Sequence, residues 1–123
     1  MGKVRFHRPN LGIYKMTYQL VKGDQAPQIQ AVLKRQDDNS IIDFSGGSCA
    51  LKFRAKGSTS TLFTLAAADV GDNFEDGIAV FSFSGTQLAI NQGYYEGEIE
   101  ITYSSGSVET VFKVLDFYVR DDF

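Results

Sequence analysis

The sequence has few of the residues that most enzymes use for catalysis. It contains one histidine and one cysteine, so a Ser-His-Asp or Cys-His arrangement finds little support, and no Cys/His cluster has the spacing of a zinc site. The lone cysteine also excludes a disulfide within the chain. We therefore expect a protein that is not an enzyme, with no catalytic residue, no cofactor and no bound metal.

Other absences narrow the range of folds and partners. Proline occurs twice and tryptophan not at all, against 12 glycines, so we expect turns built on Gly, Asn, Asp and Ser. No apolar run is long enough to predict a membrane span, and the N-terminus lacks the apolar stretch of a signal peptide. The formal net charge of −3 gives no general attraction to nucleic acid or anionic membranes, and we expect neither as a partner.

Apolar and polar residues alternate along most of the chain, in short segments separated by turn residues. A period of two predicts strands that bury one face, and the phenylalanines and tyrosines suit a β-rich core. The predicted strands are 13–22, 28–35, 41–44, 48–56, 61–65, 78–83, 93–103 and 108–119. With no clear helical pattern, a chain of 123 residues is predicted to form one all-β domain, an antiparallel sandwich or barrel.

The clearest alternation lies near the C-terminus and predicts a long hairpin. Segment 93–103 places aromatic and aliphatic residues on one face and Glu96, Glu98 and Glu100 on the other. The turn 104–107 then leads into one long return strand, 108–119. The three carboxylates, about 7 Å apart in successive steps, could be paired acid/base groups. We favour a solubilising role, because carboxylates on a solvated sheet face usually have no other.

Residues 1–12 differ in kind from the rest and predict an N-terminal arm that precedes a domain of residues 13–123. Basic or titratable residues are concentrated here, and Pro9, Asn10 and Gly12 then interrupt any regular element. The arm is either a disordered tail or a segment that docks on a neighbouring subunit, and nucleic-acid contact is the least favoured alternative. The candidate subunit-interface residues are Lys3, Arg5, Phe6 and Arg8 in the arm and Tyr118 and Phe123 near the C-terminus.

Three further features have more than one interpretation. Cys49 lies in an apolar alternation and predicts a small buried side chain rather than a reactive thiol. The acidic loop 69–77 is interpreted as solvated, as an interface loop or as a cation site, although its ligand order differs from that of an EF-hand. Tyr94 points away from the core-facing Tyr95, so it is either partly packed at the strand start or an exposed contact for glycan.

Three stretches occur in an order and spacing that resemble a known family. Val21–Pro27 carries Gly-Asp and a proline before a strand, and Asp37–Gly46 ends in Ile-Asp-Phe-Ser-Gly before the strand of Cys49. Gly93–Ile101 runs Gly-Tyr-Tyr-Glu-Gly-Glu-Ile-Glu-Ile. Together they resemble the small Ig-like β-sandwich at the N-terminus of tailed-phage baseplate upper proteins and related tail proteins. The resemblance spans about Tyr18 to Val119, and it departs at Asn39, where a turn glycine is usual.

The resemblance implies an Ig-like antiparallel β-sandwich of about 7–8 strands with an extended N-terminal arm. It also implies a bacteriophage virion structural protein, a baseplate, tail or head-attached adaptor subunit that acts by protein–protein assembly. The expected partners are other virion proteins, in a homo-oligomer or in many copies, and the expected location is the virion after synthesis in the host bacterial cytoplasm. Members of the family often continue into further domains after the sandwich, whereas this sequence ends at Phe123. We therefore expect no receptor-binding part in this chain. The alternative function is a carbohydrate-binding module for host attachment.

Overall fold

The protein is an all-β sandwich, as the alternation predicts. A computed structural model describes residues 4–7, 17–23, 27–35, 38–111 and 115–121, and these ranges contain strands and turns but no helix. No helix of the described residues is long and apolar enough to cross a membrane. The strands are β1 (Val4–His7), β2 (Thr17–Val21), β3 (Gln28–Arg35), β4 (Ser48–Ala55), β5 (Phe63–Ala66), β6 (Ile78–Ser82), β7 (Gly93–Thr102), β8 (Val108–Thr110) and β9 (Leu115–Arg120).

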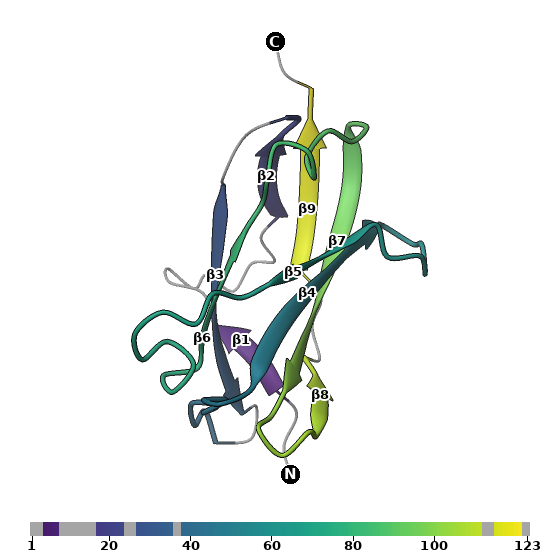
Figure 1. Ribbon diagram of the computed structural model, residues 1–123. Helices are drawn as coiled ribbons and strands as arrows, with labels where there is room; N and C mark the ends of the chain where they lie inside the picture. The colour runs from purple at the N-terminus through teal and green to yellow at the C-terminus, as the bar shows by residue number, and fades with distance from the viewer. Residues whose placement is uncertain (1–3, 8–16, 24–26, 36–37, 112–114, 122–123) are drawn as a thin grey trace.

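Two sheets form the layers of the sandwich (Figure 1). The smaller sheet has the strand order β1-β3-β6, and the larger has the order β2-β9-β7-β4-β5, with β8 also paired to β7. The first four strands alternate between the layers, whereas β4 and β5 are neighbours in the large sheet, and β7, β8 and β9 also belong to it. An Ig-like sandwich distributes its strands between two sheets in this way.

One strand pair differs from the predicted antiparallel arrangement. β2 runs parallel to β9, with Tyr18 opposite Phe117 and Leu20 opposite Val119, while the other pairs of both sheets are antiparallel. Sequence periodicity gives the face of each residue but not the direction of the neighbouring strand, so the parallel pair could not be predicted.

The core forms where the inward faces of the two sheets meet. Phe53 of β4 lies at its centre, with ring centroids 4.7 Å from Phe63, 5.1 Å from Phe117 and 5.2 Å from Tyr95. Offset and tilted rings at these separations are the favoured aromatic arrangements. The largest fully buried side chains are Phe44, Phe53, Phe81, Phe83, Phe117, Leu33, Leu51, Leu88, Ile99, Ile101 and Leu115.

The start of β7 carries a feature typical of Ig-like domains. The buried Tyr95 donates a hydrogen bond from its hydroxyl to the carbonyl oxygen of Asn91 at 2.6 Å. A tyrosine at this corner, bonded to the backbone a few residues upstream, is a hallmark of immunoglobulin folds. The position two residues later, which holds a disulfide cysteine in antibody domains, is Gly97. Leu51 fills the space there, because a Cβ on Gly97 would lie 2.6 Å from Leu51 Cδ1.

The predicted hairpin exists, but its return strand is interrupted. The turn 104–107 closes as expected, with the Tyr103 N–H bonded to the Ser107 carbonyl at 2.8 Å and Gly106 at a φ of 91°. Thr110 pairs with Glu100 and Leu115 pairs with Gly97. The return strand therefore advances five residues between these two pairs, while β7 advances three. The two additional residues divide the predicted strand 108–119 into β8 and β9. Continuous alternation hid this, because an insertion of two residues preserves the period of two.

Part of the predicted arm belongs to the small sheet. Val4–His7 forms β1 and pairs antiparallel with β3, with Val4 opposite Arg35 and His7 opposite Val32. The basic residues predict an arm, whereas the pairing of β1 depends on its backbone, which charged side chains do not prevent from joining a sheet. The predicted boundary at residue 12 lies outside the described residues and stays a prediction.

The predicted strand 41–44 is reduced to a single bridge between Ile41 and Lys34. Asp38 anchors the preceding turn by accepting a hydrogen bond from the Ser40 N–H at 2.9 Å. Asn39 takes a left-handed φ of 61°, which asparagine tolerates better than most residues. Asparagine therefore fills the turn position where the resembled family has glycine.

Candidate functional site

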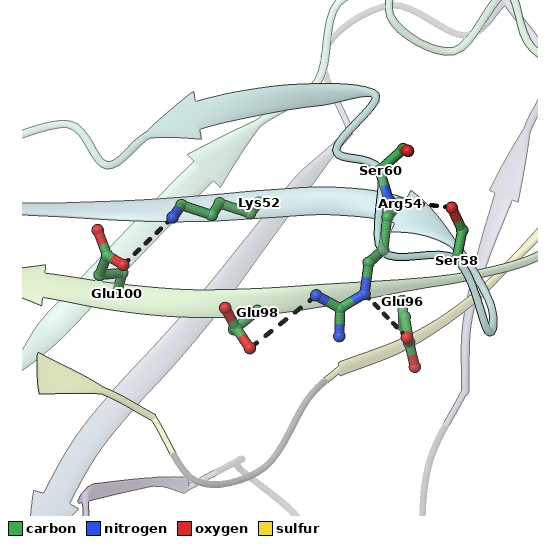
Figure 2. Close-up of polar contacts among 7 residues, drawn as sticks. All are labelled: Lys52, Arg54, Ser58, Ser60, Glu96, Glu98 and Glu100. Carbon is green, nitrogen blue, oxygen red and sulfur yellow. Dashed lines mark hydrogen bonds and ion pairs between the residues drawn. The ribbon is translucent and has the colours of Figure 1, made fainter.

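The solvent-facing side of the large sheet, which we call the outer face, carries alternating charges on β4 and β7 (Figure 2). Lys52 Nζ lies 3.2 Å from Glu100 Oε2. Arg54 Nε lies 2.9 Å from Glu96 Oε1, and Arg54 Nη1 lies 3.9 Å from Glu98 Oε2. The strand register places Arg54 directly opposite Glu96 and Lys52 opposite Glu98. Arg54–Glu96 is therefore a direct cross-strand pair, whereas Lys52–Glu100 and Arg54–Glu98 are diagonal pairs.

These contacts favour the solubilising role for the glutamates. Each of Glu96, Glu98 and Glu100 has a cationic partner on β4. An ion pair with the neighbouring strand accounts for the position of each carboxylate. These ion pairs between β4 and β7 therefore stabilise the pairing of the two strands modestly and keep the outer face polar and hydrated.

An aromatic pair lies on the same face at the start of β7. Tyr94 is 62% exposed, and its ring centroid lies 4.8 Å from that of Tyr118, its cross-strand partner on β9. The exposure of Tyr94 and the burial of Tyr95 agree with the alternation. Lys56 and Asp116 lie beside the pair, with 3.8 Å between Lys56 Nζ and Asp116 Oδ1. Aromatic rings flanked by charged groups can contact sugars or another protein.

A second feature of the large sheet is the open edge of β5. β5 is the terminal strand of this sheet and pairs with β4 alone among the described strands. The Ala67 N–H bonds to the Cys49 carbonyl at 2.8 Å. Because residues of an antiparallel pair alternate between facing the partner and facing away, the N–H and C=O groups of Thr64 and Ala66 point away from β4. We call Phe63–Ala66 with these outward groups the β5 edge.

The β5 edge is short, with four residues, but it lacks the charged residues and proline that often protect terminal strands. The stretch Gly57–Ala68 contains no charged residue and no proline, and Thr64 and Ala66 are exposed. Leu62, at the start of the strand, is 51% exposed. Natural proteins commonly block an edge with lysine, proline, a bulge or a covering loop, since an unblocked edge accepts another strand.

The other terminal strands differ from β5. In β6 the Val80 carbonyl accepts a bond from the Ala68 N–H at 3.2 Å, and the Ile78 N–H bonds to Asn73 at 2.7 Å, so a loop covers part of that edge. Lys22 directly follows β2, and β1 contains Arg5. The Ala68–Val80 bond also covers one end of the β5 edge, because Ala68 lies two residues beyond Ala66 and faces the same way, so the open part of the β5 edge lies at Thr64.

A polar cluster joins the two sheets at the far end of β3. Arg35 Nη1 lies 2.7 Å from Glu109 Oε2, and Arg35 Nη2 donates to the Tyr103 hydroxyl at 3.2 Å. The same hydroxyl donates to Glu109 Oε1 at 2.7 Å. Burial, followed by the hydrogen bond to Glu109, raises the pKa of Tyr103 to about 12. An open depression of about 510 Å³ adjoins this cluster and is lined by Arg35, Tyr103, Ser105, Ser107, Val108 and Glu109.

The predicted interface residues that the structure describes lie in different sheets. Lys3, Arg8 and Phe123 lie outside the described residues. Arg5 and Phe6 lie on β1, opposite Lys34 and Leu33, whereas Tyr118 lies on β9 in the other sheet. The role of these residues as contacts stays a prediction.

Cys49 and the acidic loop have packing roles. The Cys49 side chain is buried at 2% exposure, as predicted, and burial raises the pKa of its thiol to about 12. Loop 69–77 is anchored through Phe74, whose buried ring lies 4.5 Å from that of Phe44. Among the described residues, no group of three or more His, Cys, Asp or Glu side chains could hold a metal.

Two features escaped the sequence analysis for different reasons. The β5 edge had a local signal, the uncharged stretch Gly57–Ala68, but only sheet topology shows that this strand is terminal. The cluster of Arg35, Tyr103 and Glu109 joins residues 68 and 74 positions apart and had no local signal.

Comparisons with known proteins give only distant structural similarity. No protein-family model matches the chain, and no curated protein matches it. CopC from Methylosinus trichosporium OB3b aligns at TM-score 0.47 and 10% identity, over 87% of this chain and 86% of that one. The soluble domain of PmoD from Methylocystis sp. aligns at 0.44 and 16%, over 95% and 89%, and murine CRIg at 0.46 and 10%, over 99% and 100%. Similarity at this level supports no inference about function.

Proposed function

We propose that this protein is an assembly subunit that acts by binding other proteins through the edges of a rigid Ig-like sandwich. The observation that carries this proposal is the β5 edge, which exposes strand backbone without charge or proline. Addition of a strand to such an edge gives affinity through main-chain hydrogen bonds and needs no cofactor. The aromatic core around Phe53 supplies the rigid scaffold that holds the edge in place.

We further propose that the assembly is a bacteriophage virion, with other virion proteins as partners. The support is the resemblance of Val21–Pro27, Asp37–Gly46 and Gly93–Ile101 to the Ig-like domain of baseplate upper proteins. In this proposal the protein is made in the host bacterial cytoplasm and enters a baseplate, tail or head-attached adaptor in many copies. β1, which pairs through its backbone with β3, lies in the segment proposed to meet a neighbouring subunit.

The test is to purify particles from a lysate of the bacterium that carries the gene and to quantify this protein in them. We expect a fixed copy number per particle that survives gradient purification, and particles that assemble defectively when the gene is deleted. Particles that contain none of this protein and assemble normally without the gene would refute the virion proposal.

A carbohydrate-binding function is the second candidate, and the exposed Tyr94, which packs against Tyr118, favours it. Sugar rings stack on exposed aromatic faces, while the exposed Lys56 beside the pair supplies a polar contact. A glycan array should then give signals that are lost in Tyr94→Ala but kept in Val108→Ala, a matched change at a side chain that is 57% exposed. An array without any signal dependent on Tyr94 would argue against this function.

A further inference from the structure

We propose that the outer face of the large sheet binds an acidic carbohydrate across a row of four side chains. The row, which we call the outer row, comprises Gln19, Tyr118, Tyr94 and Lys56. This proposal rests on the carbohydrate-binding function, the second candidate above, and it names the class of sugar and the residues that contact it. Three observations support it: the alignment of the four residues, their exposure and the sign of the charge beside Tyr94.

The outer row follows one line across the sheet, because β2, β9, β7 and β4 lie side by side (Figure 1). Gln19 of β2 lies opposite Tyr118 of β9, and Tyr118 lies opposite Tyr94 of β7. The Lys56 N–H donates to the Tyr94 carbonyl at 3.1 Å, one residue beyond the last pair of β4 with β7. Neighbouring strands lie about 4.8 Å apart, so the row extends over three spacings, about 14 Å. A ligand that lies across the strands can therefore contact all four side chains.

The side chains of the outer row are accessible from solvent. Tyr94 is 62% exposed and Gln19 is exposed, while Tyr118 is half-buried with its ring centroid 4.8 Å from that of Tyr94. The centre of the row is therefore aromatic, with an amide at one end and the ammonium group of Lys56 at the other. The apolar face of a sugar ring packs on an aromatic ring, and its hydroxyl groups can pair with the donor and acceptor atoms of an amide.

The exposed charge beside Tyr94 is positive, although the whole chain carries a net charge of −3. The Lys56 side chain is 54% exposed, and its contact with Asp116 at 3.8 Å is too long for a hydrogen bond. The carboxylates in the adjacent row, Asp116 and Glu96, have side chains only 8% and 16% exposed. Lys56 can therefore donate to a carboxylate of a bound sugar, and such charge-assisted hydrogen bonds are stronger than neutral ones.

The other charged residues at this end of the sheet agree with an acidic ligand. Arg120 lies two residues beyond Tyr118 on the same face of β9 and is exposed. The exposed Asp121 lies beyond the end of β9, outside the outer row. Uronic and sialic acids combine a sugar ring with a carboxylate, so they match both the tyrosine and the lysine of the row.

The first test presents the full chain to a glycan array that pairs sialylated and uronic-acid glycans with neutral counterparts of the same length. We expect signals from acidic glycans that exceed those of their counterparts about tenfold or more, because only the acidic ones pair with Lys56. The strongest acidic glycan and its neutral counterpart are then titrated by calorimetry. An array on which no acidic glycan exceeds its counterpart would overturn the proposal.

Two variants separate the aromatic contact from the charged one. Tyr94→Ala should raise the Kd of both the acidic and the neutral glycan about tenfold or more, since both stack on the ring. Lys56→Gln keeps most of the side chain and removes its charge, so it should raise the Kd of the acidic glycan to that of the neutral one and leave the neutral one unchanged. Circular dichroism and thermal melting will show whether each variant keeps its fold.

Lys52→Gln is the matched control for charge. Lys52 lies on the same face of β4 with a side chain that is 38% exposed, but it contacts Glu100 and lies outside the outer row. We expect its Kd for the acidic glycan to equal that of the wild type. Equal effects of the two lysine substitutions would show that general charge attraction holds the ligand, and would overturn the proposal.

An acidic peptide is the competing ligand, and a titration with an oligoglutamate peptide distinguishes it. We expect no binding of this peptide that depends on Tyr94, because it offers no ring face to stack on the tyrosine. If the peptide binds with the same dependence on Tyr94 and Lys56 while the acidic glycans do not, the outer row is a protein-docking surface and the proposal is wrong.

The outcomes separate this proposal from the carbohydrate-binding function. If neutral and acidic glycans bind equally, depend on Tyr94 and are insensitive to Lys56→Gln, the preference for acidic sugars is wrong and carbohydrate binding stands. If no glycan signal depends on Tyr94, both are wrong, and the assembly function is unaffected.

Discussion

At the scale of single residues, two adjacent tyrosines differ in exposure because they lie on opposite faces of one strand. Tyr94 and Tyr95 are neighbours on β7, yet one is 62% exposed and the other is 7% exposed. The alternation of a strand assigns them to opposite faces. Only Tyr95 reaches a backbone carbonyl, that of Asn91 at 2.6 Å.

The corner tyrosine supports a prediction about stability. Tyr95→Phe keeps the buried ring but removes the donor to Asn91, so the free energy of unfolding should fall by about 1 kcal/mol. Tyr94→Phe is the matched control, and we expect a change within about 0.5 kcal/mol, because an exposed hydroxyl stays solvated. Urea unfolding of both variants measures the difference, and equal values would contradict the role of the corner.

Tyr103 supports a prediction about alkaline pH. Burial, followed by the hydrogen bond to Glu109, raises its pKa from 10.0 to about 12. Because the folded pKa lies above the unfolded one, this contribution to stability is complete below about pH 10 and is lost as the pH rises to about 12. Tyr103→Phe should therefore flatten the fall in unfolding free energy across this window. A fall as steep as that of the wild type would refute the assignment.

An absorbance titration provides an independent readout. The wild type should show a tyrosine ionisation step near pH 12 that is missing in Tyr103→Phe and retained in the exposed-site control Tyr94→Phe.

At the scale of elements, the packing of β4 against β7 depends on a position without a side chain. Gly97 lies opposite Phe53 in the register, and a Cβ there would lie 2.6 Å from Leu51 Cδ1 and 3.0 Å from Phe117 Cε2. The φ of Gly97 is not positive, so a left-handed backbone does not require glycine here. Close packing requires it instead.

We predict that Gly97→Ala destabilises the sandwich by about 1–3 kcal/mol through overpacking. Leu51→Val removes the δ carbons that the new methyl group would meet. The double variant should therefore be more stable than the sum of the two single effects predicts. Thermal unfolding of the four proteins measures this coupling, and strict additivity would show that Gly97 is not limited by Leu51.

At the scale of the whole molecule, polar contacts between the sheets supplement the apolar core. Arg35 belongs to β3 in the small sheet, and Glu109 belongs to β8 in the large one. Their side chains are 18% and 23% exposed, and the Tyr103 hydroxyl contacts both. An ion pair that shares a third hydrogen-bonding group is held in a defined geometry, which increases its contribution to stability.

We predict a coupling of about 1–2 kcal/mol between Arg35→Ala and Glu109→Ala in a double-mutant cycle of unfolding free energies. The Lys52–Glu100 pair is the control. It lies within one sheet at 3.2 Å, with side chains 38% and 27% exposed, and its coupling should be below about 0.5 kcal/mol. A coupling for Arg35 and Glu109 no larger than that of the control would show that the cluster does not hold the sheets together.

The sequence by itself determined the fold class, the face of most residues and the turn at 104–107. These properties depend on local backbone geometry and on a period of two, which neighbouring residues specify. It also determined the burial of Cys49 and the opposite faces of Tyr94 and Tyr95, since both follow from that alternation, but it left open how far Tyr94 is exposed.

Tertiary structure alone decided the parallel pairing of β2 with β9, the division of the return strand into β8 and β9, and the inclusion of residues 4–7 in a sheet. It also decided that β5 is a terminal strand and that Arg35 meets Glu109. These outcomes depend on which strands become neighbours, a choice made by long-range burial and backbone pairing rather than by any local pattern.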